Sequence, residues 1–257
     1  MCLYALKRCV QFLVHKLRQA RRLVALVGVF IIAGLDFIFR VGRSPSRRER
    51  ADWLQRSARL MLKAVGFEAT VVGTPPAGGF IAPNHLGYMD IVVLASVSPQ
   101  VFLSKLEVNS WPVVGAYCRM AGTLYIDRQR RSDVATKEAS FAEVLAAGLN
   151  MTFFLEGTST DGRAVLPFRA SLLQPVVSNS WPITPAYLKY ECEDGDVTRD
   201  ICWWGDMGFG SHIFRMFKVK HVKATVVFGK QRQPGGDRKS LANELYQDVL
   251  RLSESVA

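Results

Sequence analysis

The sequence predicts an α/β protein with a largely parallel sheet, preceded by an N-terminal helical segment that associates with membranes. Beyond Gly66, short apolar runs alternate with helical stretches, a pattern typical of layered α/β domains. Before it, basic residues surround one long apolar stretch. Hydrophobic residues make up 49% of the 257 positions and charged residues 21%, which excludes a disordered chain. We therefore expect a helical segment at 1–65 and an α/β domain at 66–257.

The N-terminal segment contains three helical stretches. Residues 4–22 have helical spacing, and residues 23–41 are almost wholly apolar. A break at 43–46 follows, and Ser46 is suited to cap a helix that runs to about residue 65. The residues expected to form one apolar face of that helix are Trp53, Leu54, Leu60, Met61 and Val65.

The α/β domain is expected to contain seven strands and four helices. The predicted strands are 68–72, 80–83, 101–104, 123–126, 151–155, 183–189 and 220–228. The predicted helices are about 88–97, 133–148, 170–178 and 238–255. Strands that alternate with helices favour parallel pairing, because each helix returns the chain to the same edge of the sheet.

The positive charge is concentrated at the N-terminus. Residues 1–50 contain eleven Lys and Arg against two acidic residues, although the whole chain carries a net charge of only +11. Such a segment indicates an anionic partner, either nucleic acid or a membrane surface. The apolar run at 23–41 favours the membrane lipid surface over nucleic acid. We interpret the segment as a monotopic, interface-embedded helix pair; a true span and a buried core helix remain alternatives.

Two further features bear on location. The five cysteines are odd in number and form no C-x-x-C pair, which argues against a disulfide framework or a zinc site and favours a reducing compartment. The apolar run begins too late for a signal peptide, and no A-x-A-like cleavage site follows it. These features predict a peripheral or monotopic protein on the cytoplasmic face of a membrane.

The first candidate site is the sequence PNHLGYMD at 83–90, which includes Asn84, His85 and Asp90. It follows a predicted strand and precedes a predicted helix, where catalytic loops of α/β proteins collect. A carboxylate five residues after a histidine can bind one ring nitrogen, so that the other can take a proton from an alcohol. The spacing alone also fits a loop histidine followed by an unrelated helix-capping aspartate.

The second candidate site is the sequence FFLEGTSTDG at 153–162. A strand runs directly into Glu156, Gly157 and Thr158, so the turn can present a carboxylate and several backbone N–H groups to a ligand. An ordinary junction between a strand and a turn would have the same composition.

The third candidate site is the segment 119–131, in which Gly122 precedes a short strand and Arg128 begins a cationic cluster. Such a cluster suits a phosphate or a carboxylate. A solvated basic turn is an equally good interpretation of this segment alone.

The ordered combination of these motifs over about residues 60–230 resembles the glycerolipid acyltransferase family, whose best-known members are the 1-acylglycerol-3-phosphate acyltransferases. The combination consists of N-H-x4-D, then Gly122 with the run YIDR at 125–128, then F-x-E-G-T, then a strand that contains Pro185. The basic, apolar N-terminus is also similar to the membrane-embedding helices of that family.

The resemblance implies a role for each matching residue. His85 would be the general base and Asp90 its orienting partner. Arg128 would bind an anionic head group, with Gly122 allowing close approach of the backbone. The other residues assigned to substrate binding or to the pocket wall are Asn84, Glu156, Gly157, Thr158, Arg169 and Pro185. The acyl donor would be acyl-CoA or acyl-acyl carrier protein and the acceptor a lysolipid, with no metal, no cofactor and no covalent enzyme intermediate.

The sequence departs from the family motif F-P-E-G-T-R at two positions, with Leu155 for Pro and Ser159 for Arg. A serine cannot replace the bidentate anion contact of an arginine. Arg169 or Arg163 could supply the missing charge. The favoured acceptor is 1-acylglycerol-3-phosphate, giving phosphatidic acid, and the alternative is another lysolipid such as a lyso-ornithine lipid.

Other classes of protein lack their motifs in this sequence. A serine hydrolase would need G-x-S-x-G, a nucleotide-binding fold a glycine-rich phosphate loop, and a zinc hydrolase H-E-x-x-H; none occurs. A non-catalytic membrane-binding protein remains as an alternative of a different class. Trp203 and Trp204 have no assigned mechanism, and buried packing is expected for them in preference to exposure at a membrane interface.

Overall fold

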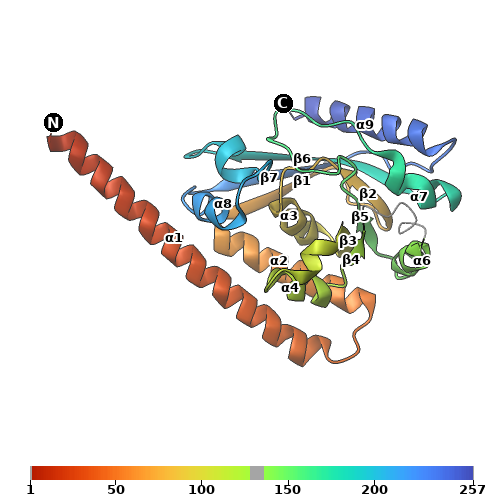
Figure 1. Ribbon diagram of the computed structural model, residues 1–257, viewed down its shortest axis with the longest axis horizontal. Coiled ribbons are helices and arrows are strands. Elements are labelled where there is room, and N and C mark those ends of the chain that lie inside the picture. Colours follow the sequence, from red (N-terminus) through yellow and green to blue (C-terminus); the bar gives the residue numbers. More distant parts are fainter. Residues whose placement is uncertain (1, 128–135, 257) are drawn as a thin grey trace.

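The computed structural model describes residues 2–127 and 136–256 and shows one α/β body from which a long N-terminal helix projects (Figure 1). The strands are β1 (Phe67–Val72), β2 (Gly79–Pro83), β3 (Gln100–Lys105), β4 (Leu124–Ile126), β5 (Asn150–Thr152), β6 (Ile183–Cys192) and β7 (Val222–Phe228). The α-helices are α1 (Cys2–Asp36), α2 (Arg47–Val65), α3 (Met89–Val97), α4 (Val114–Met120), α6 (Glu138–Ala146), α7 (Gln174–Ser178), α8 (Phe209–Met216) and α9 (Arg238–Glu254). Short helical turns are η1 (Phe37–Val41), η2 (Leu106–Ser110), η3 (Ala170–Leu173) and η4 (Val197–Ile201).

The seven strands form one sheet in the order β1-β7-β6-β2-β5-β3-β4. Every neighbouring pair is parallel except β6 and β7. The predicted α/β class and the largely parallel sheet are therefore confirmed, and each predicted strand is present. Strand β5 ends at Thr152, earlier than expected, because the chain turns at Phe154, where the Gly157 N–H bonds the Phe154 carbonyl at 3.2 Å.

The sheet is covered on both faces (Figure 1). On one face α2, α3 and α8 bury the first apolar cluster, which includes Trp53 and Leu94. On the other face α6, α7 and α9 bury the second, which includes Phe141 and Leu245. Because a sheet covered on both sides buries successive residues of its strands, β2 is buried at all five positions.

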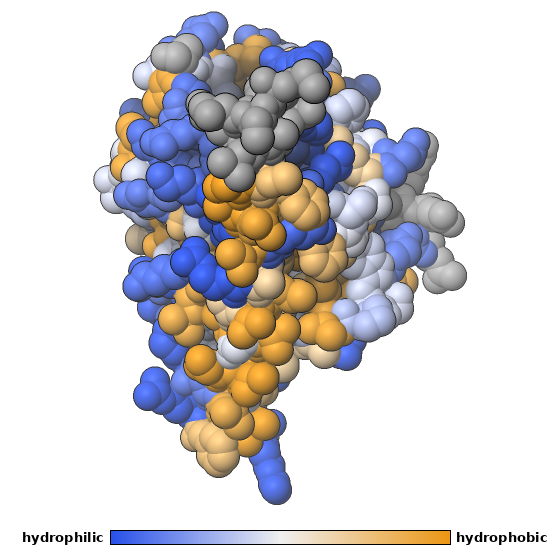
Figure 2. All heavy atoms as spheres, turned by 90° about the vertical axis from the view of Figure 1, so that its left-hand side faces the viewer, coloured by the Kyte–Doolittle hydropathy of each residue, from blue (hydrophilic) through white to orange (hydrophobic). Residues whose placement is uncertain are grey.

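The N-terminal segment is one continuous helix, so the expected boundary between 4–22 and 23–41 does not exist; only η1 breaks the helical pattern, at its end. Most of its apolar side chains point to solvent, with Val24 72% and Phe39 80% exposed, and they form the orange band along the helix in Figure 2. The buried core helix is therefore the wrong alternative. By length and composition, the stretch from Cys9 to Val41 could cross a membrane.

A few residues of α1 dock it to the body. Ala33 accepts a hydrogen bond of 2.8 Å from the indole N–H of Trp53 on α2. Arg22, which is buried, donates to the carbonyl of Lys220 at 2.7 Å, just beyond α8. The helix is thus fixed on one side by polar contacts, and its apolar side remains uncovered.

Helix α2 begins as expected. The Ser46 side chain accepts from the Glu49 N–H, and the Glu49 carboxylate accepts from the Ser46 N–H at 2.8 Å, forming a capping box. Trp53, Leu54, Met61 and Val65 are buried as predicted, but Leu60 is not. Leu60 instead lines an open groove of about 380 Å³ between α1 and α2.

Candidate active site

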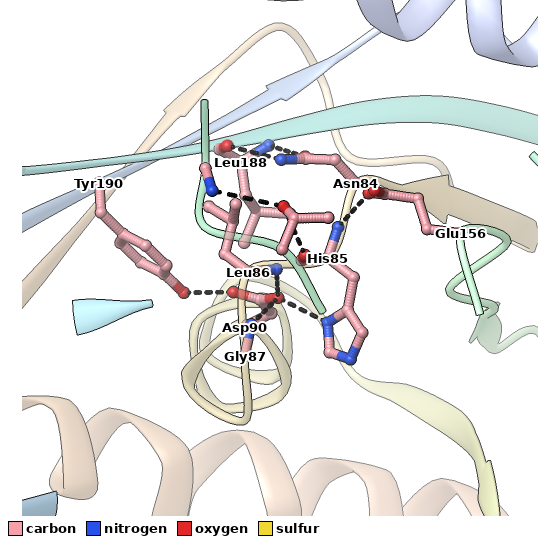
Figure 3. A network of polar contacts seen from close by, with 10 residues as sticks. Asn84, His85, Leu86, Gly87, Asp90, Glu156, Leu188 and Tyr190 are labelled. Atoms are coloured by element: carbon pink, nitrogen blue, oxygen red, sulfur yellow. Dashed lines mark hydrogen bonds and ion pairs between the residues drawn. The ribbon is translucent and has the colours of Figure 1, made fainter. Parts of the chain in front are cut away.

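The histidine loop lies where β2 ends, at the edge of the sheet shared by the carboxyl ends of β2, β5 and β6. Asn84 fixes the start of this loop, because its side chain donates to the Leu188 carbonyl at 3.1 Å and accepts from the Leu188 N–H at 2.7 Å (Figure 3). Both amide groups are thus used within the protein. Asn84 therefore holds the loop against β6, a role distinct from the substrate contact that was expected.

His85 and Asp90 are in contact, which is the arrangement that the H-x4-D spacing allows. His85 Nδ1 lies 2.8 Å from Asp90 Oδ2, and the other ring nitrogen, Nε2, points away from the carboxylate (Figure 3). Because Asp90 holds Nδ1, that nitrogen carries the proton in the neutral ring and Nε2 can act as the base. The His85 side chain is 20% exposed, so a substrate can reach it.

Asp90 is fully buried, and each of its oxygens accepts hydrogen bonds. Oδ2 accepts from the backbone N–H groups of Leu86 at 2.6 Å and Gly87 at 2.9 Å, in addition to His85. Oδ1 accepts from the Tyr190 hydroxyl at 2.7 Å. A buried carboxylate with this many donors is held in one position. Tyr190 was not anticipated, because nothing in its local sequence indicates a partner 100 residues away.

The imidazole is also fixed from its face. Phe154 stacks on the His85 ring with 4.0 Å between centroids and 24° between planes. Phe154, two residues beyond the end of β5, is itself buried, so the imidazole ring of His85 cannot turn toward that side. Packing and hydrogen bonding therefore select the same orientation of His85.

The buried carboxylate of Glu156 joins two loops through hydrogen bonds. Its Oε1 accepts from the backbone N–H of His85 at 2.6 Å (Figure 3). Its Oε2 accepts from the N–H of Leu166 at 2.9 Å. The carboxylate, expected to position the acceptor, thus faces backbone groups of the protein. Burial raises the pKa of Glu156 to about 7 despite these two hydrogen bonds.

This raised pKa predicts a pH dependence of stability. The folded state holds the Glu156 proton more tightly than the unfolded state, so the free energy of unfolding falls as pH rises from about 4.5 to about 7. The shift corresponds to a loss of up to about 3 kcal/mol. Chemical denaturation at pH 5 and pH 8 should show this loss in the wild type and a smaller one in Glu156→Gln. Equal pH dependence in both proteins would contradict it.

Arg169 lies across the turn that follows β5. Gly157 has φ of +76°, and a Cβ built on it would lie 2.9 Å from Arg169 Cζ, so only glycine lets the guanidinium approach so closely. The Arg169 backbone N–H bonds the Leu155 carbonyl at 2.8 Å, and its side chain is exposed. Thr158 is exposed on the same turn. These three candidates therefore lie together beside the histidine loop.

Two other candidates in the described part of the chain, Gly122 and Pro185, are not brought to this cluster. Gly122, with φ of +76°, lies against the side chain of Arg50 on α2. Pro185 is buried in β6, where it pairs with Ala82 and packs against Gly229, on the face covered by α9. Arg128 lies outside the described residues.

Within residues 2–127 and 136–256, no group of three or more His, Cys, Asp or Glu side chains could hold a metal ion. The groups gathered at this edge of the sheet are a solvent-accessible imidazole, a buried carboxylate that orients it, and an exposed guanidinium. An imidazole held in this way can take a proton from a hydroxyl group, and an exposed guanidinium can bind an anion. The fold and site thus define an α/β enzyme of the group-transfer class.

Comparisons with known proteins agree with this class. The model of the Acyltransferase family matches residues 70–189. The chain is 31% identical to the 1-acyl-sn-glycerol-3-phosphate acyltransferase of Neisseria meningitidis serogroup B, over 73% of each chain. It is 31% identical to the lyso-ornithine lipid O-acyltransferase of Pseudomonas aeruginosa, over 77% of this chain and 75% of the relative.

A solved structure shows the same fold. The 1-acyl-sn-glycerophosphate acyltransferase of Thermotoga maritima superposes with a TM-score of 0.67 at 17% identity, covering 93% of this chain and 98% of the other. The chain belongs to the glycerolipid acyltransferase family and is an acyltransferase. The alternative of a non-catalytic membrane-binding protein is therefore wrong.

Proposed function

We propose that the enzyme moves a fatty acyl group from an acyl thioester to the free hydroxyl of a lysolipid, with 1-acylglycerol-3-phosphate as the favoured acceptor and phosphatidic acid as the product. The observation that carries the proposal is the His85–Asp90 pair, with Nε2 directed away from the carboxylate and accessible. The names of the relatives support a lysolipid acceptor.

In the proposed reaction the lysolipid hydroxyl donates its hydrogen bond to Nε2 of His85. As the oxygen attacks the thioester carbonyl, His85 takes the proton, and Asp90 stabilises the imidazolium that forms. The tetrahedral intermediate then collapses with cleavage of the C–S bond, and the imidazolium returns the proton to the departing thiolate. The products are the diacyl lipid and the free thiol of coenzyme A or of acyl carrier protein, and no acyl-enzyme forms.

Arg169 is proposed to replace the arginine that the sequence lacks at Ser159. Its guanidinium lies over Gly157, whose N–H bonds the Phe154 carbonyl in the turn beside the histidine loop. Arg163, the other candidate, has a side chain that is 77% exposed and lies 3.5 Å from the Asp161 carboxylate. Arg169 is therefore the better placed of the two to bind a phosphate.

Replacing Arg169 by alanine should raise KM for lysophosphatidate by about 10-fold or more, since a charge-assisted hydrogen bond contributes about 1.5–3 kcal/mol. The kcat value should change much less. Arg163→Ala is the matched control, because it removes the same charge from the same loop, and its KM should stay at the wild-type value. Steady-state kinetics with varied acceptor measure both, and equal KM values in Arg169→Ala and the wild type would refute the contact.

The acceptor itself is tested by lipid mass spectrometry after expression in a strain that lacks its own lysophosphatidate acyltransferase. We expect the strain to recover phosphatidic acid synthesis. A second acceptor, lyso-ornithine lipid, is favoured by one specific observation, the absence of arginine at position 159. New ornithine lipid without recovery of phosphatidic acid would establish that second function instead.

The exposed apolar side of α1 is proposed to lie in the membrane interface, on the cytoplasmic face. Other exposed apolar side chains lie on the body, with Trp111 and Val113 just before α4 and Phe214 on α8. Their burial in lipid stabilises the bound state in proportion to the apolar area removed from water. An interfacial position brings the site to its lipid substrate.

Placing two charges on this surface should release the protein from membranes. Val24→Asp/Ile31→Asp changes two side chains that are exposed, so folding should be preserved. The control Val71→Asp/Val72→Asp changes two exposed valines at the end of β1 and should leave binding intact. Sedimentation with anionic vesicles measures the bound fraction. Unchanged sedimentation of the α1 variant would refute the interfacial contact.

A further inference from the structure

The loop at 84–88 has no regular secondary structure, so its shape depends on contacts with its surroundings. On one side, the Asn84 side chain bonds the loop to β6, and on a second side the Glu156 carboxylate bonds it to the turn after β5. The remaining side is covered by the segment from η4 to α8, which none of the recognised motifs includes.

The backbone of this segment approaches the loop closely. The Trp203 N–H donates to the Leu86 carbonyl at 2.8 Å. Gly87 has φ of +154°, and a Cβ built on it would lie 3.0 Å from the nitrogen of Trp203. A side chain at position 87 would therefore push the two segments apart. Trp203 thus packs as expected, whereas Trp204 is 36% exposed, contrary to the expectation for it.

Tyr88 joins the loop to α8 through its side chain. Its ring makes aromatic contacts with Trp203, Phe209 and His212, at centroid distances of 5.8, 5.0 and 5.6 Å. Its hydroxyl lies 2.9 Å from Nδ1 of His212, a residue 124 positions later in the chain. His212 is fully buried.

Both partners of this hydrogen bond are neutral. Burial, followed by the nearby charge of Arg215, lowers the pKa of His212 to about 4, although the carbonyl of Cys202 and the carboxylate of Asp200 oppose the shift. Burial raises the pKa of Tyr88 above that of an ordinary tyrosine. The pair therefore adds no charge near the site, and its effect on the loop is geometric.

Side chains of α1 bond to the carboxyl end of α8 and to the residues that follow it. The Gln19 side chain donates to the carbonyl of Phe214 at 2.7 Å, and Arg22 donates to the carbonyls that follow α8, including that of Lys220. His212 thus belongs to a helix whose carboxyl end is fixed by hydrogen bonds. Because the helix is fixed, it can position the loop that it contacts.

We propose that Tyr88 and His212 are positioning residues of the transferase, whose hydrogen bond holds the 84–88 loop so that His85 meets Asp90 in the reactive geometry. In the sequence, Tyr88 lies between His85 and Asp90, three residues after the histidine and two before the aspartate. The inference rests on the proposed function of His85. A misplaced base loses rate more than binding, since the substrate contacts are made elsewhere on the loop after β5.

The test compares single and double variants in the membrane-reconstituted enzyme. Tyr88→Phe, which removes only the hydroxyl, should lower kcat about tenfold and leave KM for both substrates within about twofold. His212→Leu should do the same, and the double variant should be no slower than either single one because both remove one shared contact. His212→Gln, which keeps a polar group for the Tyr88 hydroxyl, should retain most of the wild-type kcat.

Tyr117→Phe is the matched control. Its hydroxyl is also buried and hydrogen-bonds the Ser57 hydroxyl, but it joins α4 to α2 away from the loop. It should lower the melting temperature about as much as Tyr88→Phe and leave kcat unchanged. Wild-type kcat in Tyr88→Phe, or an equal loss in Tyr117→Phe, would overturn the inference. Should His212→Leu fail to fold, Tyr88→Phe and His212→Gln decide alone. An inactive wild type would instead refute the proposed function.

Discussion

Replacing His85 by alanine is expected to lower kcat by at least about 100-fold, the usual effect of losing a general base. In the described part of the chain, His85 is the imidazole that bonds the buried Asp90. Without it, no second imidazole among these residues is in place to act as the base. The measurement is the rate of thiol release with saturating acyl-CoA and lysophosphatidate. KM should change little, because the base contributes to the transition state more than to binding.

The control for this variant is His221→Ala. His221 is a surface histidine, and its Nε2 lies 3.3 Å from the carboxylate of Glu68 on β1, an edge strand separated from β2 by β7 and β6. Like His85, His221 has a carboxylate partner, but it lies away from the proposed site. We expect wild-type kcat from His221→Ala. A kcat for His85→Ala within a few-fold of wild type would refute the role of the base.

Asp90→Asn is expected to lower kcat by about 100-fold or more as well, because asparagine replaces one carboxylate oxygen with a hydrogen-bond donor. With that donor at the Oδ2 position it would face the N–H groups of Leu86 and Gly87, and at the Oδ1 position it would face the Tyr190 hydroxyl. Neither orientation satisfies all partners. The imidazolium also loses its compensating charge.

The diagnostic feature of Asp90→Asn is a fall in kcat with little change in KM. Asp52→Asn provides a control, because Asp52 is a partly exposed carboxylate on α2 that bonds Arg48, four residues earlier on the same helix. We expect it to retain full activity. An increase in KM at constant kcat in Asp90→Asn would show that the carboxylate serves substrate binding, contrary to the proposal.

The sequence was informative where structure depends on local pattern. Short apolar runs identified every strand, because a sheet covered on both faces needs such runs. The N-cap at Ser46 was predictable from local sequence, and the His85–Asp90 contact from the ordered combination of motifs. The short helices α4 and α8 were missed because seven or eight residues carry little periodic signal.

What the sequence could not show is which distant groups converge. Tyr190 reaches Asp90 from β6, and His212 reaches Tyr88 from α8; neither contact leaves a signal in a single sequence. For the same reason the spacing could not choose between Arg163 and Arg169, whereas the structure places only Arg169 over Gly157. Glu156 lies beside the histidine loop, but its carboxylate faces backbone N–H groups, which the motif alone does not reveal.

The most direct test of the central claim is single-turnover thiol release by the purified, lipid-reconstituted enzyme. With acyl-CoA and lysophosphatidate, we expect one thiol released for each molecule of phosphatidic acid formed, a rate that depends on both substrates, and almost no reaction in His85→Ala. A burst of thiol from acyl-CoA before acceptor is added would indicate an acyl-enzyme and contradict direct attack by the hydroxyl. Undiminished release in His85→Ala would contradict the role of His85 as the base.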